Sequence, residues 1–416
     1  MRFPRLSLAV ALGVGGICDG TAAERKIPPI AGELAGNLVL HGWPAFPGLA
    51  WKVTAVAAGD ATLLRLSATA PGLNLQVEAR LPADGGRGSW RVTEGAADVE
   101  AWLPVAKAQP GLAALPGDLK MSGAIRLAGE GTWQGSDWAG TVSSTLENGR
   151  ADSATQGWSA ADIGVVSELD VRAGVATLRK AQIRVGSVQA AGLVLQDLRV
   201  DVAGADGQRL QVSRAELELL GGHVTLAPFV FDPAAPAVET TADFSRLSLG
   251  ELARLAPQAL AEADGRLDGR IALRWTAAAG FELGAGSLAT TAGVPATIRL
   301  AAKPGFLTER MPRTISLLPD WLGPVAKWFS PANPAYGTLS DIEMGRQPLA
   351  VERLSLKLYP DGPDAARSTL VELAARPTAG GAVDRVDFTV NVAGPLNQVL
   401  RLGLNESVQV KVGAGP

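Results

Sequence analysis

Apolar and polar residues alternate along most of the chain, which is the pattern of β-strands with one apolar face. The alternation is cleanest at 73–78, 198–202, 271–275, 354–358, 386–392 and 408–412. Turn-forming pairs such as Asn148-Gly149 separate these segments. The spacing predicts a strand roughly every 10 to 15 residues, joined mostly as hairpins. We therefore expect an all-β chain with a mostly antiparallel sheet.

Helical periodicity is confined to a few short segments. Three leucines at helical spacing predict one or two short helices near 248–263. Prolines limit a second segment near 315–330, where Trp321, Val325 and Trp328 would share one side of an amphipathic helix. That side either caps an apolar core or contacts a membrane or a partner, because tryptophan suits a water–lipid boundary.

The first 23 residues have the features of a secretory signal peptide. Two arginines precede an apolar run at 6–17, and small residues at 21–23 form a cleavage site. We expect a cleavable signal over 1–23, with a retained N-terminal anchor as the alternative. Cleavage would remove Cys18 and leave a mature chain without a thiol, which suits the periplasm or cell envelope.

The charge and the reactive side chains exclude several classes of function. The chain has 38 Lys+Arg against 41 Asp+Glu with no basic block, so we expect no nucleic-acid partner. Two His and one Cys cannot build a His/Cys metal site. No nucleophile elbow or phosphate-binding loop occurs. The pairs Asp98/Glu100 and Glu216/Glu218 are expected on solvated strand faces. We predict no enzyme, no cofactor and no metal.

The second part of the chain carries a sequence resemblance. Its residues are a strand opening on Gly-Gly at 221–229, a Leu-rich helix at 249–255, a strand with Gly-Arg-Leu-Asp-Gly at 263–271, and two segments at 336–339 and 388–396 that are expected to be closing strands. From about Val165 onward the chain resembles the YdbH family of AsmA-like envelope proteins. We accordingly divide the mature chain into an N-terminal β-rich region, 24–164, and a YdbH-like region, 165–416.

The resemblance implies an elongated, curved sheet that forms a hydrophobic groove and carries phospholipid between the inner and outer membranes. It also implies a small outer-membrane lipoprotein that adds strands to the open end of the sheet. The groove wall would be the apolar phase of the alternating strands. These residues are Leu198, Val200, Val202, Val224, Leu226, Ile271, Leu273, Trp275, Leu354, Leu356, Leu358, Val386, Phe388, Val390 and Val392.

Two other functions compete with lipid transfer. In a structural or adhesive envelope protein, a second sheet would cover the apolar face and make a dry β-sandwich core. An exported hydrolase is the weaker rival, since no catalytic constellation is visible in the sequence.

Overall fold

All 21 strands in the described part of the chain belong to one open sheet, and every strand pair with a described register is antiparallel. The computed structural model describes residues 31–39, 46–84, 86–108, 116–134, 137–172, 175–190, 192–205, 209–255, 257–276, 280–309, 311–315, 331–359 and 369–392. The all-β, antiparallel prediction is confirmed. Contacts group the chain into unit 1, residues 1–216 with 228–237, and unit 2, residues 217–227 with 238–416. The boundary that we expect near residue 164 stays a prediction.

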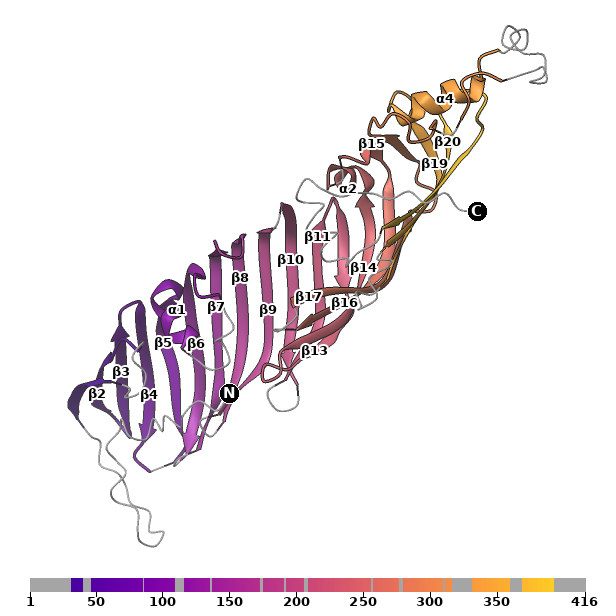
Figure 1. The fold of residues 1–416 in the computed structure, drawn as a ribbon. Coiled ribbons are helices and arrows are strands. Elements are labelled where there is room, and N and C mark those ends of the chain that lie inside the picture. The colour runs from indigo at the N-terminus through magenta and orange to yellow at the C-terminus, as the bar shows by residue number, and fades with distance from the viewer. Residues whose placement is uncertain are drawn as a thin grey trace. The chain divides into compact units, whose positions relative to one another are not determined.

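Unit 1 is a succession of hairpins. Its elements are β1 (Gly32–Leu38), β2 (Leu49–Ala58), β3 (Ala61–Ala70), β4 (Leu73–Pro82), β5 (Gly88–Asp98), α1 (Val99–Lys107), β6 (Lys120–Gln134), β7 (Asp137–Ser153), β8 (Trp158–Arg172), β9 (Val175–Ala190), β10 (Leu193–Gly204), most of β11 (Leu210–Leu219) and β13 (Phe229–Phe231). From β1 to β10 each strand pairs with the next one along the chain. Figure 1 shows β2 to β10 side by side in this order.

The alternation of unit 1 shifts by one residue at a row of left-handed positions. Asn148 in β7, Asp162 in β8 and Asp197 in β10 have φ angles of 54°, 56° and 49°. The Asn-Gly pair that was expected to form a turn between strands therefore lies inside β7. Asn and Asp tolerate this region better than most side chains. The β8–β9 and β9–β10 registers continue unshifted past Asp162 and Asp197. In the sequence of β8 the apolar positions change by one residue across Asp162, from Ala160 to Ile163. Simple period-2 alternation does not predict this shift.

Helix α1 shows that the prediction of a shared strand face for Asp98 and Glu100 is wrong. Asp98 ends β5 and caps α1, because its side chain accepts a hydrogen bond of 2.9 Å from the Glu100 backbone N–H. The two carboxylates therefore do not share a strand face. Pro104 lies inside this nine-residue helix and obscures it in the sequence. Glu216 does lie on a strand, β11.

Unit 2 combines strands with two described helices. Its elements are β12 (Gly222–Leu226), β14 (Ala237–Ser248), α2 (Leu249–Leu255), β15 (Leu260–Asp264), β16 (Arg266–Thr276), β17 (Gly280–Thr290), β18 (Ala296–Leu300), α4 (Pro334–Glu343), β19 (Leu349–Leu358), β20 (Thr369–Pro377) and β21 (Val386–Val392). Strands β16 and β17 form a hairpin, β17 and β18 both pair with β19, and β20 lies between β19 and β21.

The two helical predictions have different outcomes. The helix expected near 248–263 is present only as α2, because the chain beyond Pro257 forms β15 and pairs with β18 instead. The helix expected near 315–330 lies outside the described residues. Helix α4 was not predicted, and it contains 336–339, so the prediction of a closing strand there is wrong. Asn333 caps α4 by accepting a hydrogen bond of 3.1 Å from Ala335 N–H, and Pro334 occupies its first turn.

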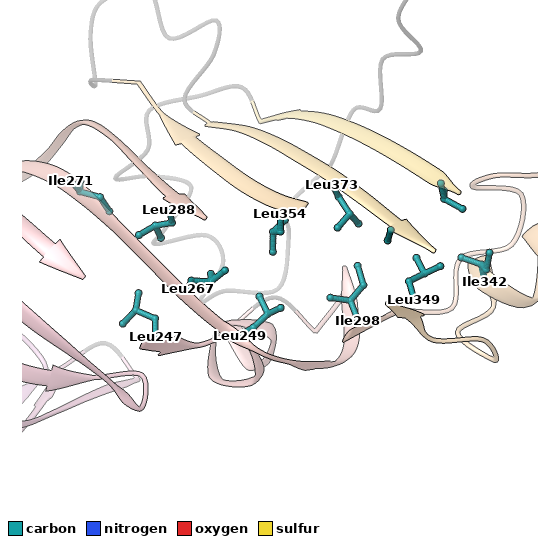
Figure 2. Packing of buried hydrophobic residues seen from close by; sticks show 12 residues of the cluster. Leu247, Leu249, Leu267, Ile271, Leu288, Ile298, Ile342, Leu349, Leu354 and Leu373 are labelled. Carbon is teal, nitrogen blue, oxygen red and sulfur yellow. The ribbon is translucent and has the colours of Figure 1, made fainter. Parts of the chain in front are cut away.

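The core of unit 2 is a single cluster of aliphatic side chains. Strands β14 and β16 to β21 and both helices contribute to it, and Leu267, Ile342 and Leu349 are fully buried. Figure 2 shows the labelled side chains gathered between the ribbons of these strands. One face of this part of the sheet is therefore covered by protein.

A buried carboxylate fastens α4 to the preceding loop. Glu343 is only 3% exposed, and its Oε2 accepts hydrogen bonds from Leu307 N–H at 2.8 Å and Thr308 N–H at 3.1 Å. Its Oε1 accepts one from the Thr308 hydroxyl at 2.7 Å. Burial acts to raise the pKa of Glu343, but the hydrogen bonds outweigh it and lower that pKa below its ordinary value. The carboxylate is thus held ionised inside the fold.

Candidate functional site

One face of unit 1 is lined by apolar residues from strand to strand. Cross-strand neighbours place one residue of each strand from β1 to β9 in a continuous row on this face. The row is Leu34, Val53, Leu66, Val77, Val92, Gly129, Val142, Leu169 and Leu178. We call the side of unit 1 that carries this row the apolar face. Because strand side chains alternate, parallel rows two residues away lie on the same face.

The opposite face carries the charges. The row one residue away from the apolar one is Thr54, Arg65, Glu78, Arg91, Glu130, Thr141, Asp170 and Thr177. Arg65 and Glu78 form an ion pair of 3.0 Å, and Arg91 reaches Glu130 at 3.5 Å. These pairs are exposed and stabilise the fold little. Their importance is that they identify this face as the one facing water.

No second layer covers the apolar face among the described residues. Helix α1 lies against β5 and β6, and Figure 1 draws no second sheet of described residues stacked on β2 to β10. Most side chains of the row are half-buried, while Leu34 at the edge is 59% exposed. A core that another layer of protein covered would be more completely buried.

Tryptophans lie flat on glycines within the apolar face. A Cβ built on Gly131 would approach Trp90 Nε1 to 2.6 Å, and one built on Gly140 would approach the same ring to 2.5 Å. Glycine at these strand positions therefore makes room for the indole. Trp133 and Trp138 stack beside it with ring centroids 5.0 Å apart. Indole rings therefore cover glycine backbone in this part of the apolar face.

The predicted groove residues of β10 lie on this surface. Val200 faces Ile183, Leu198 faces Val185, and Val202 is buried beside Ala181. The sequence prediction missed the earlier strands, which it assigned only to a β-rich region. The sequence of β6 does indicate the apolar face, because Gly129, Gly131 and Trp133 occupy alternate positions.

The predicted groove residues of unit 2 lie in or near its core. Ile271, Leu354 and Val386 are buried in the core cluster, and four others pack against it: Leu273, Leu356, Leu358 and Phe388. The structure pairs Val224 with Phe244, Leu226 with Ala242, and Val390 with Val371. Trp275 is half-buried on β16. Their role as a groove wall stays a prediction. The side chain of Val392, and Trp321, Val325 and Trp328, lie outside the described residues.

Comparison with known families identifies the chain. A family model described as YdbH-like, intermembrane phospholipid transport protein YdbH, matches residues 35–324. The chain belongs to the YdbH-like family. The match begins well before Val165, so family membership includes the apolar face of unit 1, whereas the segments at 336–339 and 388–396 lie beyond it. No curated protein and no solved structure matches this YdbH-like chain.

The described residues also bear on whether the chain has a membrane span, a metal site or a histidine site. No helix there is both long and apolar enough to cross a bilayer. No three His, Cys, Asp or Glu side chains come together in those residues as a metal-binding group. His223 is exposed on β12 opposite Ser245, in the polar phase of the strand as expected. His41 lies outside the described residues.

Proposed function

We propose that this chain binds phospholipid acyl chains on the apolar face of unit 1 and carries them between the inner and outer membranes of a cell envelope. The observation that carries the proposal is a sheet with one charged face and one apolar face that no described layer covers. Membership of a family described as intermembrane phospholipid transport proteins supports phospholipid as the cargo. Such a carrier needs no catalytic group, and we infer that the chain is not an enzyme.

The energetics of this surface suit acyl chains. Burial of one methylene contributes about 0.8 kcal/mol, so a 16-carbon chain gains roughly 10 kcal/mol before the cost of ordering it. Hydrocarbon has no polar groups to satisfy, and the indole ring of Trp90, which lies against Gly131 and Gly140, offers it apolar contact. Lipid on this face would complete the burial that the described protein layers leave partial.

We extend the proposal to four other parts of the molecule and its partners. The predicted wall residues of unit 2 bind lipid as well, a small outer-membrane lipoprotein adds strands to the sheet, and residues 1–23 direct export to the envelope. Trp321, Val325 and Trp328 contact a membrane or partner from a segment whose two ends are held together. Ile315 N–H donates to the Pro331 carbonyl at 3.0 Å, and Asn333 N–H donates to the Arg313 carbonyl at 2.8 Å.

Two adjacent valines of β8 test the surface directly. Val165 is half-buried on the apolar face between Leu146 and Ile183, whereas Val166 is 47% exposed on the charged face. We expect Val165→Asn to lower the phospholipid that copurifies with the protein at least about threefold, because an amide replaces apolar contact area. Val166→Asn makes the same chemical change on the other face and should leave the amount unchanged. The amount of copurified phospholipid is measured by mass spectrometry of organic extracts.

The comparison between the two valines decides the proposal. Circular dichroism of both variants shows whether the sheet is retained. Equal lipid content in the two folded variants, or no phospholipid in the unsubstituted protein, would overturn lipid binding on the apolar face.

A further inference from the structure

Two hydroxyl groups interrupt the apolar face of unit 1. Ser144 in β7 and Ser167 in β8 are direct cross-strand neighbours, and their Oγ atoms are 2.8 Å apart. Both are half-buried. Their same-face neighbours are all apolar, namely Val142 and Leu146 along β7, Val165 and Leu169 along β8, Leu127 on β6 and Ala181 on β9. The pair is therefore a polar position surrounded by hydrocarbon.

One hydroxyl proton of this pair is not used by the hydrogen bond between the two serines. Two serines carry two hydroxyl protons, and the hydrogen bond between Ser144 and Ser167 uses one of them. While the face is open, water can accept the second proton. Once acyl chains exclude water, a hydroxyl without an acceptor is destabilising. A ligand that supplies an acceptor at this point is then favoured over one that supplies only hydrocarbon.

We propose that the Ser144–Ser167 pair binds the acyl ester carbonyl of a glycerolipid and so fixes the position of the lipid along the apolar face. This inference rests on the proposed function and adds the part of the ligand that is recognised. The ester carbonyl is the polar atom closest to the acyl chains, so it can reach a hydroxyl that lies among valine and leucine side chains. Hydrocarbon on either side of the pair then covers the rows of Val142 and Leu146.

Ester and ether lipids of the same chain length separate carbonyl recognition from hydrocarbon burial. Full-length protein is equilibrated with vesicles that contain equal amounts of diester and diether phosphatidylcholine, isolated by flotation, and its bound lipids are quantified by mass spectrometry. We expect the unsubstituted protein to enrich the diester about three- to tenfold, as one net hydrogen bond allows. In Ser144→Ala/Ser167→Ala the ratio should fall to about one. Because both partners are removed together, no unsatisfied group remains to destabilise the sheet.

Ser143 provides the matched control. It precedes Ser144 on β7 but lies on the charged face opposite Glu168, where its hydroxyl donates to the Ala128 carbonyl. Ser143→Ala should keep the full preference for the diester. Equal binding of the two lipids by the unsubstituted protein, or the same ratio in the double variant, overturns the carbonyl site while lipid binding stands. Binding of neither lipid would instead overturn the proposed function itself.

Discussion

Replacing Leu267 by alanine should lower the free energy of unfolding of unit 2 by about 3 to 5 kcal/mol. Leu267 has no exposed surface and lies in the core cluster with Ile271, Leu288 and Ile298. The substitution removes buried methyl groups and leaves a cavity that strands on both sides of the cluster cannot easily close. The free energy of unfolding of unit 2 is measured by hydrogen exchange, followed peptide by peptide during urea denaturation. This method reports on each unit separately, because the two units need not unfold together.

The same substitution at an exposed leucine is the control. Leu34 is 59% exposed on β1, so Leu34→Ala should change stability by less than about 1 kcal/mol. A small loss at Leu267 would show that the core of unit 2 is not a packed protein interior. It would then be a surface that tolerates a cavity, such as a groove wall.

Alternation along the chain predicted the strands but not what covers them. Ile271 and Leu354 show the same period-2 pattern as Val165, yet the first two are buried in a protein core while Val165 lies on a face without a described cover. Period 2 depends only on the backbone and reports that one face avoids water. Whether protein or lipid covers that face depends on strand pairings far apart in the sequence, such as β17 with β19.

Local departures from the pattern were also invisible in the sequence. The left-handed residue Asp162 moves the apolar phase of β8 by one position, so its two halves look like separate strands with opposite faces. Asp98 looks like a polar strand residue, but it caps a helix that contains Pro104. A left-handed backbone at Asp162 and a side-chain cap at Asp98 thus each override the periodicity. The Ser144–Ser167 pair needed the cross-strand register, which only the structure provides.

Loss of the Glu343 carboxylate should destabilise unit 2 by at least about 3 kcal/mol. In Glu343→Ala the backbone N–H groups of Leu307 and Thr308 and the Thr308 hydroxyl lose their acceptor at a buried position. Each unsatisfied buried donor costs about 1 to 3 kcal/mol. We expect the loop at 303–309 to show the largest gain in hydrogen exchange, since this carboxylate holds its turn against α4.

The matched variant Glu343→Gln separates the hydrogen bonds from the charge. Glutamine keeps an acceptor for the backbone N–H groups and offers an N–H to the Thr308 hydroxyl, so its cost at neutral pH should be smaller than that of alanine. Because the pKa of Glu343 is lowered in the fold, its ionised form stabilises the folded state. This contribution is fully present above the ordinary pKa of 4.5 and is lost as the pH falls through the lowered value. The stability gap between the unsubstituted protein and Glu343→Gln should therefore narrow in acid. A gap that stays constant or widens as the pH falls would show that the charge of Glu343 does not stabilise unit 2.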